Sequence, residues 1–138
     1  MTNTEKNLPQ NPFASDNPIG SVIINLVDAH SKAIAAKLRT IGLYRGQEML
    51  LKAISDCDGC SQNQLATQLC LDHSSITKSI TRMEKSGYVE REKSTADRRI
   101  TLVKITPAGR DILTQAELIW SQTEQAAAQE LSIEDVRN

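Results

Sequence analysis

The chain has 138 residues, of which 16 are Lys or Arg and 17 are Asp or Glu, so its net charge is −1. This length suits one domain, and a composition of 39% hydrophobic and 24% charged residues excludes a largely disordered chain. No stretch approaches the roughly 18 apolar residues of a membrane-spanning helix. The polar start also lacks the apolar segment of a secretory signal, so we expect a cytoplasmic protein.

The charge is unevenly distributed along the chain. Residues 1–73 have a net charge of −1, with six basic and seven acidic side chains. Residues 74–110 carry nine basic and four acidic side chains, and residues 111–138 carry one basic and six acidic side chains. The near-neutral total therefore conceals a basic block beside an acidic tail. Such a block is typical of a surface that binds an anionic partner, with a solvated basic face as the alternative.

The first third of the chain predicts an arm and two helices. Residues 1–17 contain prolines and no apolar period, so we expect a flexible arm. Apolar residues then recur every three or four positions, which predicts a long amphipathic helix over 18–42 that Gly42 ends. A second helix is expected from about residue 45 to residue 55, with inward side chains at Met49, Leu50, Ala53 and Ile54.

Two short helices follow, each with a predicted N-cap. Ser61 and Gln64 form a capping box for the first, and Asp72 caps the second, which runs to about residue 85. The apolar stripe of the second helix is Ile76, Ile80 and Met83. Its other face carries only hydrogen-bond donors and cations: Ser74, Ser75, Thr77, Lys78, Thr81, Arg82 and Lys85.

A β-hairpin and a long helix are expected next. Residues 88–93 and 99–105 are rich in Val, Ile, Tyr and Thr, and residues 94–98 form a polar link between them. Thr106 and Pro107 are typical of a helix start, and this helix is expected to reach about residue 129. Ser132 begins another helix of which few residues follow.

This order of elements predicts a winged helix-turn-helix: a mainly α-helical fold with a small β-hairpin wing, flanked by two long helices. The second short helix has the diameter of the DNA major groove, and its N-terminus presents N–H groups to phosphate. The wing tip holds Arg98 and Arg99, with Asp97 close enough to orient one of them. An arginine on a narrow loop suits the minor groove of DNA.

Residues 44–110 resemble the MarR-type (multiple antibiotic resistance regulator) transcriptional regulators. The most specific segment runs from Asp97-Arg98-Arg99 to Thr106-Pro-Ala-Gly109; Ser61–Ala66, Leu71–Thr77 and Arg82–Arg91 also carry the resemblance. It implies a homodimeric repressor that binds pseudo-palindromic double-stranded operator DNA, with dimerisation helices over 18–42 and 107–138 and the winged region over 43–106. The implied DNA-binding residues are Ser61, Gln62, Ser74, Ser75, Thr77, Lys78, Thr81, Arg82, Asp97, Arg98 and Arg99. Unlike the family's last helix, the helix after Ser132 is expected to be truncated.

Effector binding and cysteine oxidation are two further expectations that the resemblance brings. Regulators of this family release DNA when a small aromatic ligand binds or a cysteine is oxidised. His30, Tyr44 and Arg45 are the candidate effector contacts, with packed structural roles as the alternative. Cys57 and Cys60 are candidates for a redox pair, with ordinary reduced loop cysteines as the alternative.

Other functions are not supported by the sequence. Cys57, Cys60, Cys70 and His73 have zinc-like spacing, but the predicted helix between the two pairs holds them too far apart to share one ion, so no metal is expected. The chain contains no phosphate-binding glycine loop and no hydrolase motif, so we expect neither a cofactor nor an enzyme. The remaining alternative is a winged-helix module that binds an acidic protein partner.

Overall fold

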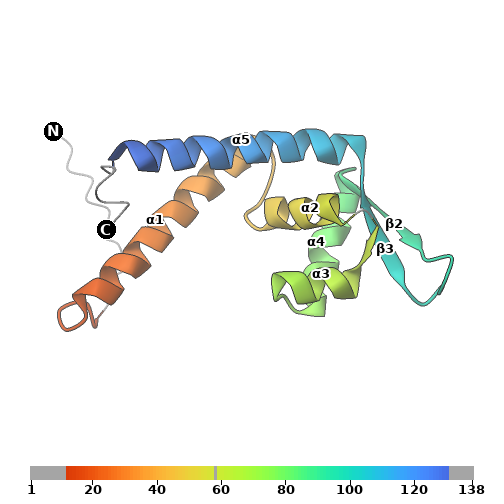
Figure 1. The fold of residues 1–138 in the computed structure, drawn as a ribbon, viewed down its shortest axis with the longest axis horizontal. Helices are drawn as coiled ribbons and strands as arrows, with labels where there is room; N and C mark the ends of the chain where they lie inside the picture. The colour runs from red at the N-terminus through yellow and green to blue at the C-terminus, as the bar shows by residue number, and fades with distance from the viewer. Residues whose placement is uncertain (1–11, 58, 131–138) are drawn as a thin grey trace. The chain divides into compact units, whose positions relative to one another are not determined.

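A computed structural model describes residues 12–57 and 59–130 of the chain. The first eleven residues of the arm expected over 1–17, and the helix expected after Ser132, lie outside these ranges. No helix within the described residues is long and apolar enough to cross a membrane. Five helices and three strands are described (Figure 1): α1 (Pro18–Thr40), α2 (Gln47–Asp56), β1 (Cys60–Ser61), α3 (Gln62–Leu69), α4 (His73–Lys85), β2 (Val89–Lys93), β3 (Thr101–Ile105) and α5 (Pro107–Glu130). The predicted fold, mainly helical with a small winged sheet, is confirmed.

Most of the apolar side chains of helix α1 are exposed to solvent. The chain divides after Ala33 into two compact units, and only Ile34 and Leu38, on the last turns of α1, belong to the core of the second unit. The apolar side chains before Ala33 are between 57% and 77% exposed: Ile19, Val22, Ile23, Ile24, Leu26 and Val27. The predicted helix is therefore present, but most of its apolar stripe is uncovered in a single chain.

The core of the second unit lies where the short helices meet the sheet. Helix α2 packs against α3, α5 and β3, and α4 packs against α3 and β2. The fully buried side chains include the predicted α4 stripe: Leu43, Leu50, Leu51, Ile54, Leu65, Ile76, Ile80, Met83, Val89 and Val103. The prediction that Met49 points inward is wrong, because it is 55% exposed and Leu51 occupies the inward position. In a short helix with consecutive apolar residues, the sequence pattern does not decide which edge of the stripe faces the core.

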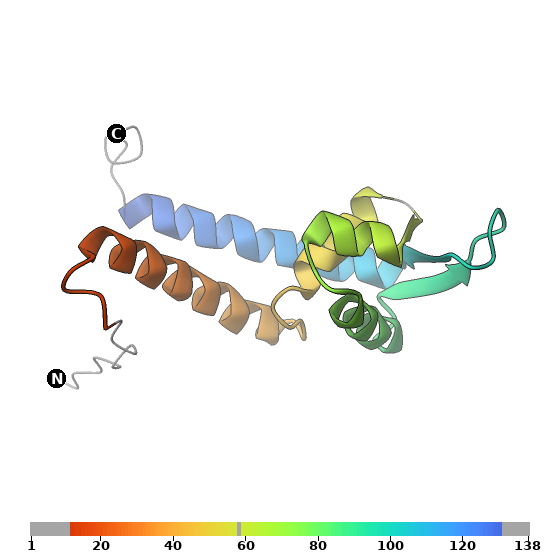
Figure 2. The ribbon, with the colours of Figure 1, turned by 90° about the horizontal axis from the view of Figure 1, so that it is seen from below.

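The wing is a three-stranded antiparallel sheet in the order β1-β3-β2. Strands β2 and β3 pair from Val89↔Ile105 to Lys93↔Thr101, and Cys60 of β1 pairs with Val103 on the other edge of β3. The hairpin was predicted, but β1 was missed because two residues are too few to show a period. The β2–β3 hairpin extends away from α2, α3 and α4 in both Figure 1 and Figure 2.

The predicted caps hold the short helices in place. The Ser61 hydroxyl accepts from the Gln64 N–H at 3.1 Å while the Gln64 side chain accepts from the Ser61 N–H at 2.9 Å, which is a capping box. Asp72 accepts from the Ser75 N–H at 2.8 Å. Between these helices Cys70 has a φ of 52°, a left-handed conformation that a residue with a Cβ adopts at some cost.

The start of α5 approaches the start of β2 at very close range. Thr106 donates its hydroxyl to the Gly87 carbonyl at 2.6 Å and accepts from the Gly109 N–H at 3.0 Å. A Cβ on Gly109 would overlap the Tyr88 carbonyl oxygen and lie 2.8 Å from Ile105 Cγ1. This is the physical reason for the Thr-x-x-Gly spacing, because only glycine permits the approach.

Candidate nucleic-acid interface

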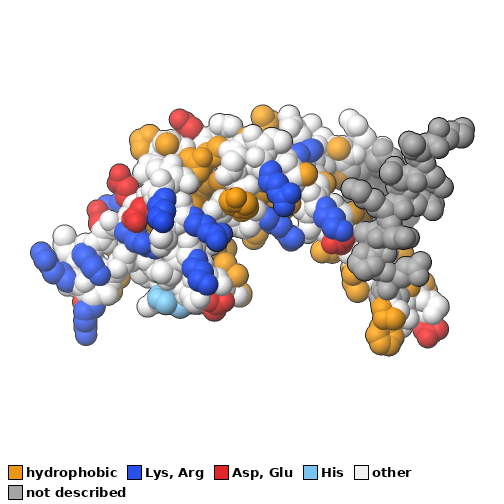
Figure 3. Space-filling model, turned by 180° about the vertical axis from the view of Figure 1, so that it is seen from behind, with side chains coloured by type: hydrophobic (Ala, Val, Ile, Leu, Met, Phe, Trp, Pro, Cys, Tyr) orange, Lys and Arg blue, Asp and Glu red, His pale blue; other side chains and the backbone are white. Residues whose placement is uncertain are grey.

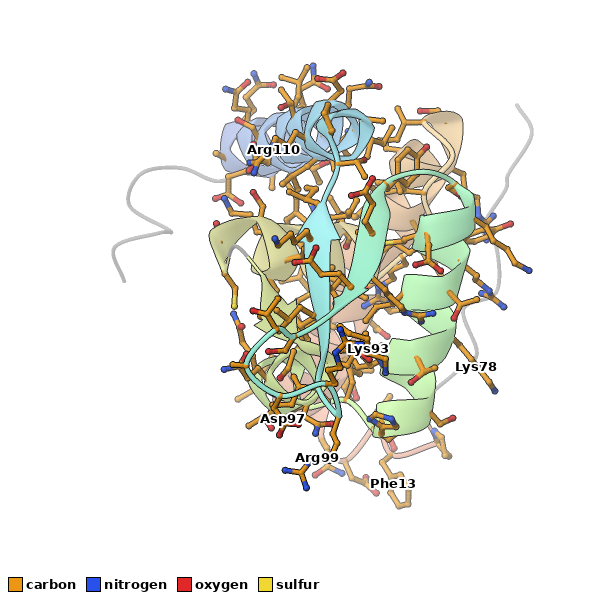
Figure 4. The ribbon with its side chains drawn as sticks, turned by 90° about the vertical axis from the view of Figure 1, so that its right-hand side faces the viewer. Phe13, Lys78, Lys93, Asp97, Arg99 and Arg110 are labelled. Atoms are coloured by element: carbon orange, nitrogen blue, oxygen red, sulfur yellow. The ribbon has the colours of Figure 1, made fainter. Side chains whose placement is uncertain are left out.

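One face of α4 is open to solvent and basic. Ser74, Lys78, Arg82 and Lys85 are exposed, on the side of the helix away from its buried stripe. Figure 4 shows the Lys78 side chain pointing outward from the helix. Lys78 and Arg82 form no ion pair with any part of the chain that the structure describes. These side chains are therefore available to an external anion.

Other predicted contact residues of the two short helices are already bound within the protein. The Thr77 hydroxyl donates to the His73 carbonyl at 2.8 Å and accepts from Gln62 Nε2 at 3.2 Å. The Thr81 hydroxyl donates to the Thr77 carbonyl at 2.8 Å. The Ser75 hydroxyl donates to Asp72 at 2.8 Å, so it supports the N-cap. The bond from Gln62 to Thr77 joins α3 to α4, and the other bonds stay within α4 and its N-cap.

The wing tip presents an oriented arginine. Arg99 donates from Nε and Nη2 to the two oxygens of Asp97 at 3.1 and 3.0 Å, and its backbone N–H donates to Asp97 Oδ1 at 3.0 Å. The Arg99 side chain is nevertheless 90% exposed, and Figure 4 shows the pair at the end of the hairpin. The arginine holds the pKa of Asp97 below its ordinary value, and the carboxylate raises the pKa of Arg99. The ion pair thus holds the Arg99 guanidinium in one orientation while leaving it open to solvent.

A polar groove of about 300 Å³ lies between the wing and the starts of α3 and α4. Its lining residues are Ser61, Gln62, Asn63, His73, Arg99, Ile100 and Thr101. Hydroxyl, amide and guanidinium groups of this kind donate hydrogen bonds to phosphate oxygens. Figure 3 shows Lys and Arg side chains at the protruding wing and also spread across the rest of this face. Residues 74–110 carry a net charge of +5.

Comparisons with known proteins agree with this geometry. The profile of the MarR family matches residues 43–101. The chain is 32% identical over 93 residues to a proposed transcriptional regulatory protein for the hcr operon of Thauera aromatica, covering 67% of this chain and 56% of that protein. It is 30% identical over 82 residues to the uncharacterised HTH-type regulator YdgJ of Bacillus subtilis, covering 59% and 50%. The region over residues 43–101 belongs to the MarR family.

Solved structures of MarR-family proteins share the fold. A mutant MarR from E. coli complexed with operator DNA superposes with a TM-score of 0.79 at 23% identity, over 93% of this chain and 92% of that one. A probable transcriptional regulator from Pseudomonas aeruginosa gives 0.76 at 25% identity, over 89% and 92%. The chain spans about half the length of the curated relatives it matches, 56% and 50% of the two described above. Those relatives are named as transcriptional regulators, not as enzymes.

The predicted effector residues of this chain lie on α1 and before α2. His30 is half-buried on α1, and Tyr44 and Arg45 are exposed in the turn that leads to α2. An apolar cavity of about 370 Å³, which the sequence did not indicate, lies between α2, α3 and α5. Met49, Leu69, Leu113 and Trp120 form its apolar walls, and its charged lining is Glu48, Lys52, Asp56 and Glu117.

The three cysteines differ in their exposure. Cys57 and Cys70 are exposed, whereas Cys60 is buried in β1. Burial, together with the neighbouring Cys57, raises the pKa of the Cys60 thiol to about 12. Cys60 therefore stays protonated at neutral pH, which disfavours the thiolate chemistry of a redox pair. No His, Cys, Asp and Glu group within the described ranges is arranged to hold a metal ion.

Proposed function

We propose that this chain is a sequence-specific, double-stranded-DNA-binding transcriptional regulator that acts as a homodimeric repressor in the cytoplasm. The observation that carries the proposal is the wing tip, where Asp97 orients a guanidinium that is 90% exposed. This tip lies on the same unit as the exposed cations of α4. An oriented arginine beside a helix with free donors suits adjacent minor and major grooves of DNA.

The predicted contacts divide by chemistry into three groups. Ser74, Lys78 and Arg82 project from α4 and would meet base edges or phosphates in the major groove. Arg99 would enter the minor groove, with Arg98 near phosphate. The third group, which is bonded within the protein, would set the geometry of the interface: Ser61, Gln62, Ser75, Thr77, Thr81 and Asp97. Of these, the Ser61 hydroxyl and the Gln62 amide would donate to the DNA backbone.

We propose that the segments over 18–42 and 107–138 form the dimer interface. The apolar side chains of α1 from Ile19 to Val27 are more than half exposed, and Leu118 of α5 is 57% exposed. Exposed apolar surface of this kind on a helix marks an interface with another protein surface. A second copy of the chain on it would give a two-fold symmetric dimer, which requires a pseudo-palindromic operator.

Operator binding tests this function. DNA selected by the chain from a random-sequence library serves as the operator, and fluorescence anisotropy measures its affinity at increasing salt. Because neutralised phosphates release counterions, we expect the affinity to fall by orders of magnitude between about 50 and 200 mM salt. A flat response would favour the alternative, a module that binds an acidic protein.

Substitution of the wing arginine tests the site itself. Arg99→Ala should weaken operator binding by roughly 5- to 150-fold, the usual effect of losing one specific groove contact. Arg110→Ala removes the same charge on α5, far from the wing tip in Figure 4, and is the matched control. Equal affinity of the Arg99 variant and the wild-type chain would contradict the minor-groove assignment.

A small aromatic effector that releases the DNA completes the proposal. His30, Tyr44 and Arg45 are the residues that the sequence predicts for it, and the cavity beside Met49 and Trp120 offers apolar walls. Titrating benzoate and neutral phenols into the DNA complex tests release. The redox alternative for Cys57 and Cys60 is tested in the same assay by adding peroxide, and the burial of Cys60 predicts no response.

A further inference from the structure

Helix α4 has three parallel stripes with different surroundings. The first is the buried stripe Ile76, Ile80 and Met83. The second, one residue further round the helix, is Thr77, Thr81 and Glu84, which the structure places against Arg91 of β2. The third is the exposed stripe that begins with Lys78 and Arg82. With 100° between successive residues, the three stripes face different directions, so the rotation of the helix about its axis decides which side chains face outward.

Arg91 contacts each residue of the middle stripe. Its Nη2 donates to the Thr81 hydroxyl at 2.8 Å and to the Thr77 carbonyl at 3.1 Å. Its Nη1 lies 3.6 Å from Glu84 Oε1, and the Arg91 side chain is only 23% exposed. On the other side of the same stripe, Gln62 of α3 holds the Thr77 hydroxyl at 3.2 Å. The middle stripe therefore forms hydrogen bonds with both β2 and α3.

Arg91 is poorly matched to a role in stability alone. It occupies the inward face of β2, two residues after the buried Val89, where an apolar side chain would normally lie. Its Nε is buried without a hydrogen-bond partner among the described residues. An unsatisfied buried donor destabilises the folded state, and apolar replacements of buried charged groups are often tolerated. What an apolar side chain could not supply is a directional bond to both Thr77 and Thr81.

We propose that Arg91 is a positioning residue for DNA sequence recognition: it fixes the rotation of α4 against the wing and thereby determines which α4 side chains reach the base edges. The proposal rests on the proposed function, because it concerns how the same surface reads DNA. It assigns Thr77 and Thr81, which the sequence placed at the DNA surface, to holding the helix. Arg91 itself does not contact phosphate.

Selectivity, measured apart from affinity, tests the proposal. The probes are the duplex that the wild-type chain selects from a random library and a scrambled duplex of equal length. Arg91→Met should reduce the ratio of the two affinities by about tenfold or more, the effect of misreading a base pair. Its salt dependence should stay unchanged, since no phosphate contact is lost. Lys93→Met, on the exposed part of the same strand, removes an equal charge and should leave the ratio within about twofold.

Thr81 provides a second, independent test. Thr81→Val removes the acceptor of Arg91 and keeps the shape, so it should lower the ratio like Arg91→Met. The double variant should be no worse than either single variant, because both changes release the same contact. Arg91→Lys keeps one donor and should recover part of the selectivity. An unchanged ratio in Arg91→Met, or additive losses in the double variant, would overturn the proposal.

A readout without DNA separates this proposal from the proposed function. Arg91→Met should speed amide hydrogen exchange in α4 by about tenfold relative to the β2–β3 pairing, whereas Lys93→Met should not. A wild-type chain that selects no sequence would contradict the proposed function alone. Unchanged exchange in α4 of the Arg91 variant would contradict the positioning role whatever the DNA result.

Discussion

Replacing Gly109 with alanine is the sharpest test of how the wing is joined to α5. The added Cβ would overlap the Tyr88 carbonyl oxygen, which is backbone and cannot rotate away as a flexible side chain would. The helix start must therefore move outward. That movement stretches the two hydrogen bonds of Thr106, from its hydroxyl to the Gly87 carbonyl at 2.6 Å and from its N–H to the Tyr88 carbonyl at 3.0 Å.

The expected change in the free energy of unfolding has two destabilising contributions and one stabilising contribution. Overpacking of this kind costs about 1–3 kcal/mol, and each weakened hydrogen bond costs about 1 kcal/mol. Alanine recovers about 1 kcal/mol of helix propensity relative to glycine. We therefore expect Gly109→Ala to lower the free energy of unfolding by about 2–4 kcal/mol.

Urea unfolding followed by circular dichroism measures this change at one fixed chain concentration. With an m value of about 2 kcal/mol/M, the middle of the usual range in urea, the midpoint should fall by about 1–2 M. Gly20→Ala on α1 is the matched control, because no atom lies within 4 Å of the added Cβ and the helix gains propensity. A Gly109 variant that is as stable as the wild-type chain would refute the close-approach argument.

Three further predictions concern cysteine, buried charge and capping. Maleimide should label Cys57 and Cys70 in the folded chain and Cys60 only after unfolding, since Cys60 is buried and its pKa is raised to about 12; three equally fast thiols would contradict this. Burial raises the pKa of Glu48, so its contribution to stability is present below its unfolded pKa of about 4.3 and is lost as the pH rises through the folded value. Glu48→Gln keeps an acceptor for the Gly46 N–H but cannot titrate, so it should remove the loss of Tm as the pH rises through the folded pKa of Glu48. A Tm–pH curve identical to that of the wild-type chain would refute this prediction. The Ser75 N–H and O–H lower the pKa of Asp72, so Asp72→Ala should reduce the Tm at neutral pH, and the difference should vanish as acid protonates the wild-type carboxylate.

Local chemistry made much of the fold predictable from the sequence. Capping pairs such as Ser61 with Gln64 depend on residues three positions apart, and the structure has them where the sequence placed them. The same holds for the α4 stripe, whose period follows from helix geometry alone. The pairing of Asp97 with Arg99 was also predictable from the sequence, because it joins residues two positions apart at a turn.

The sequence by itself therefore determined the order of elements, their caps, the basic character of the wing and α4, and the family. Only the tertiary structure decided which polar side chains are already occupied. The Thr77 and Thr81 hydroxyls look free to bind DNA, but they donate to the His73 and Thr77 carbonyls. Gln62 of α3 donates to the Thr77 hydroxyl, and Arg91, on a strand ten residues after Thr81, donates to the Thr81 hydroxyl. The third strand at Cys60, the exposure of Met49 and the cavity beside Trp120 likewise depend on distant segments meeting. Such contacts are set by packing in three dimensions, and no period or spacing along the chain encodes them.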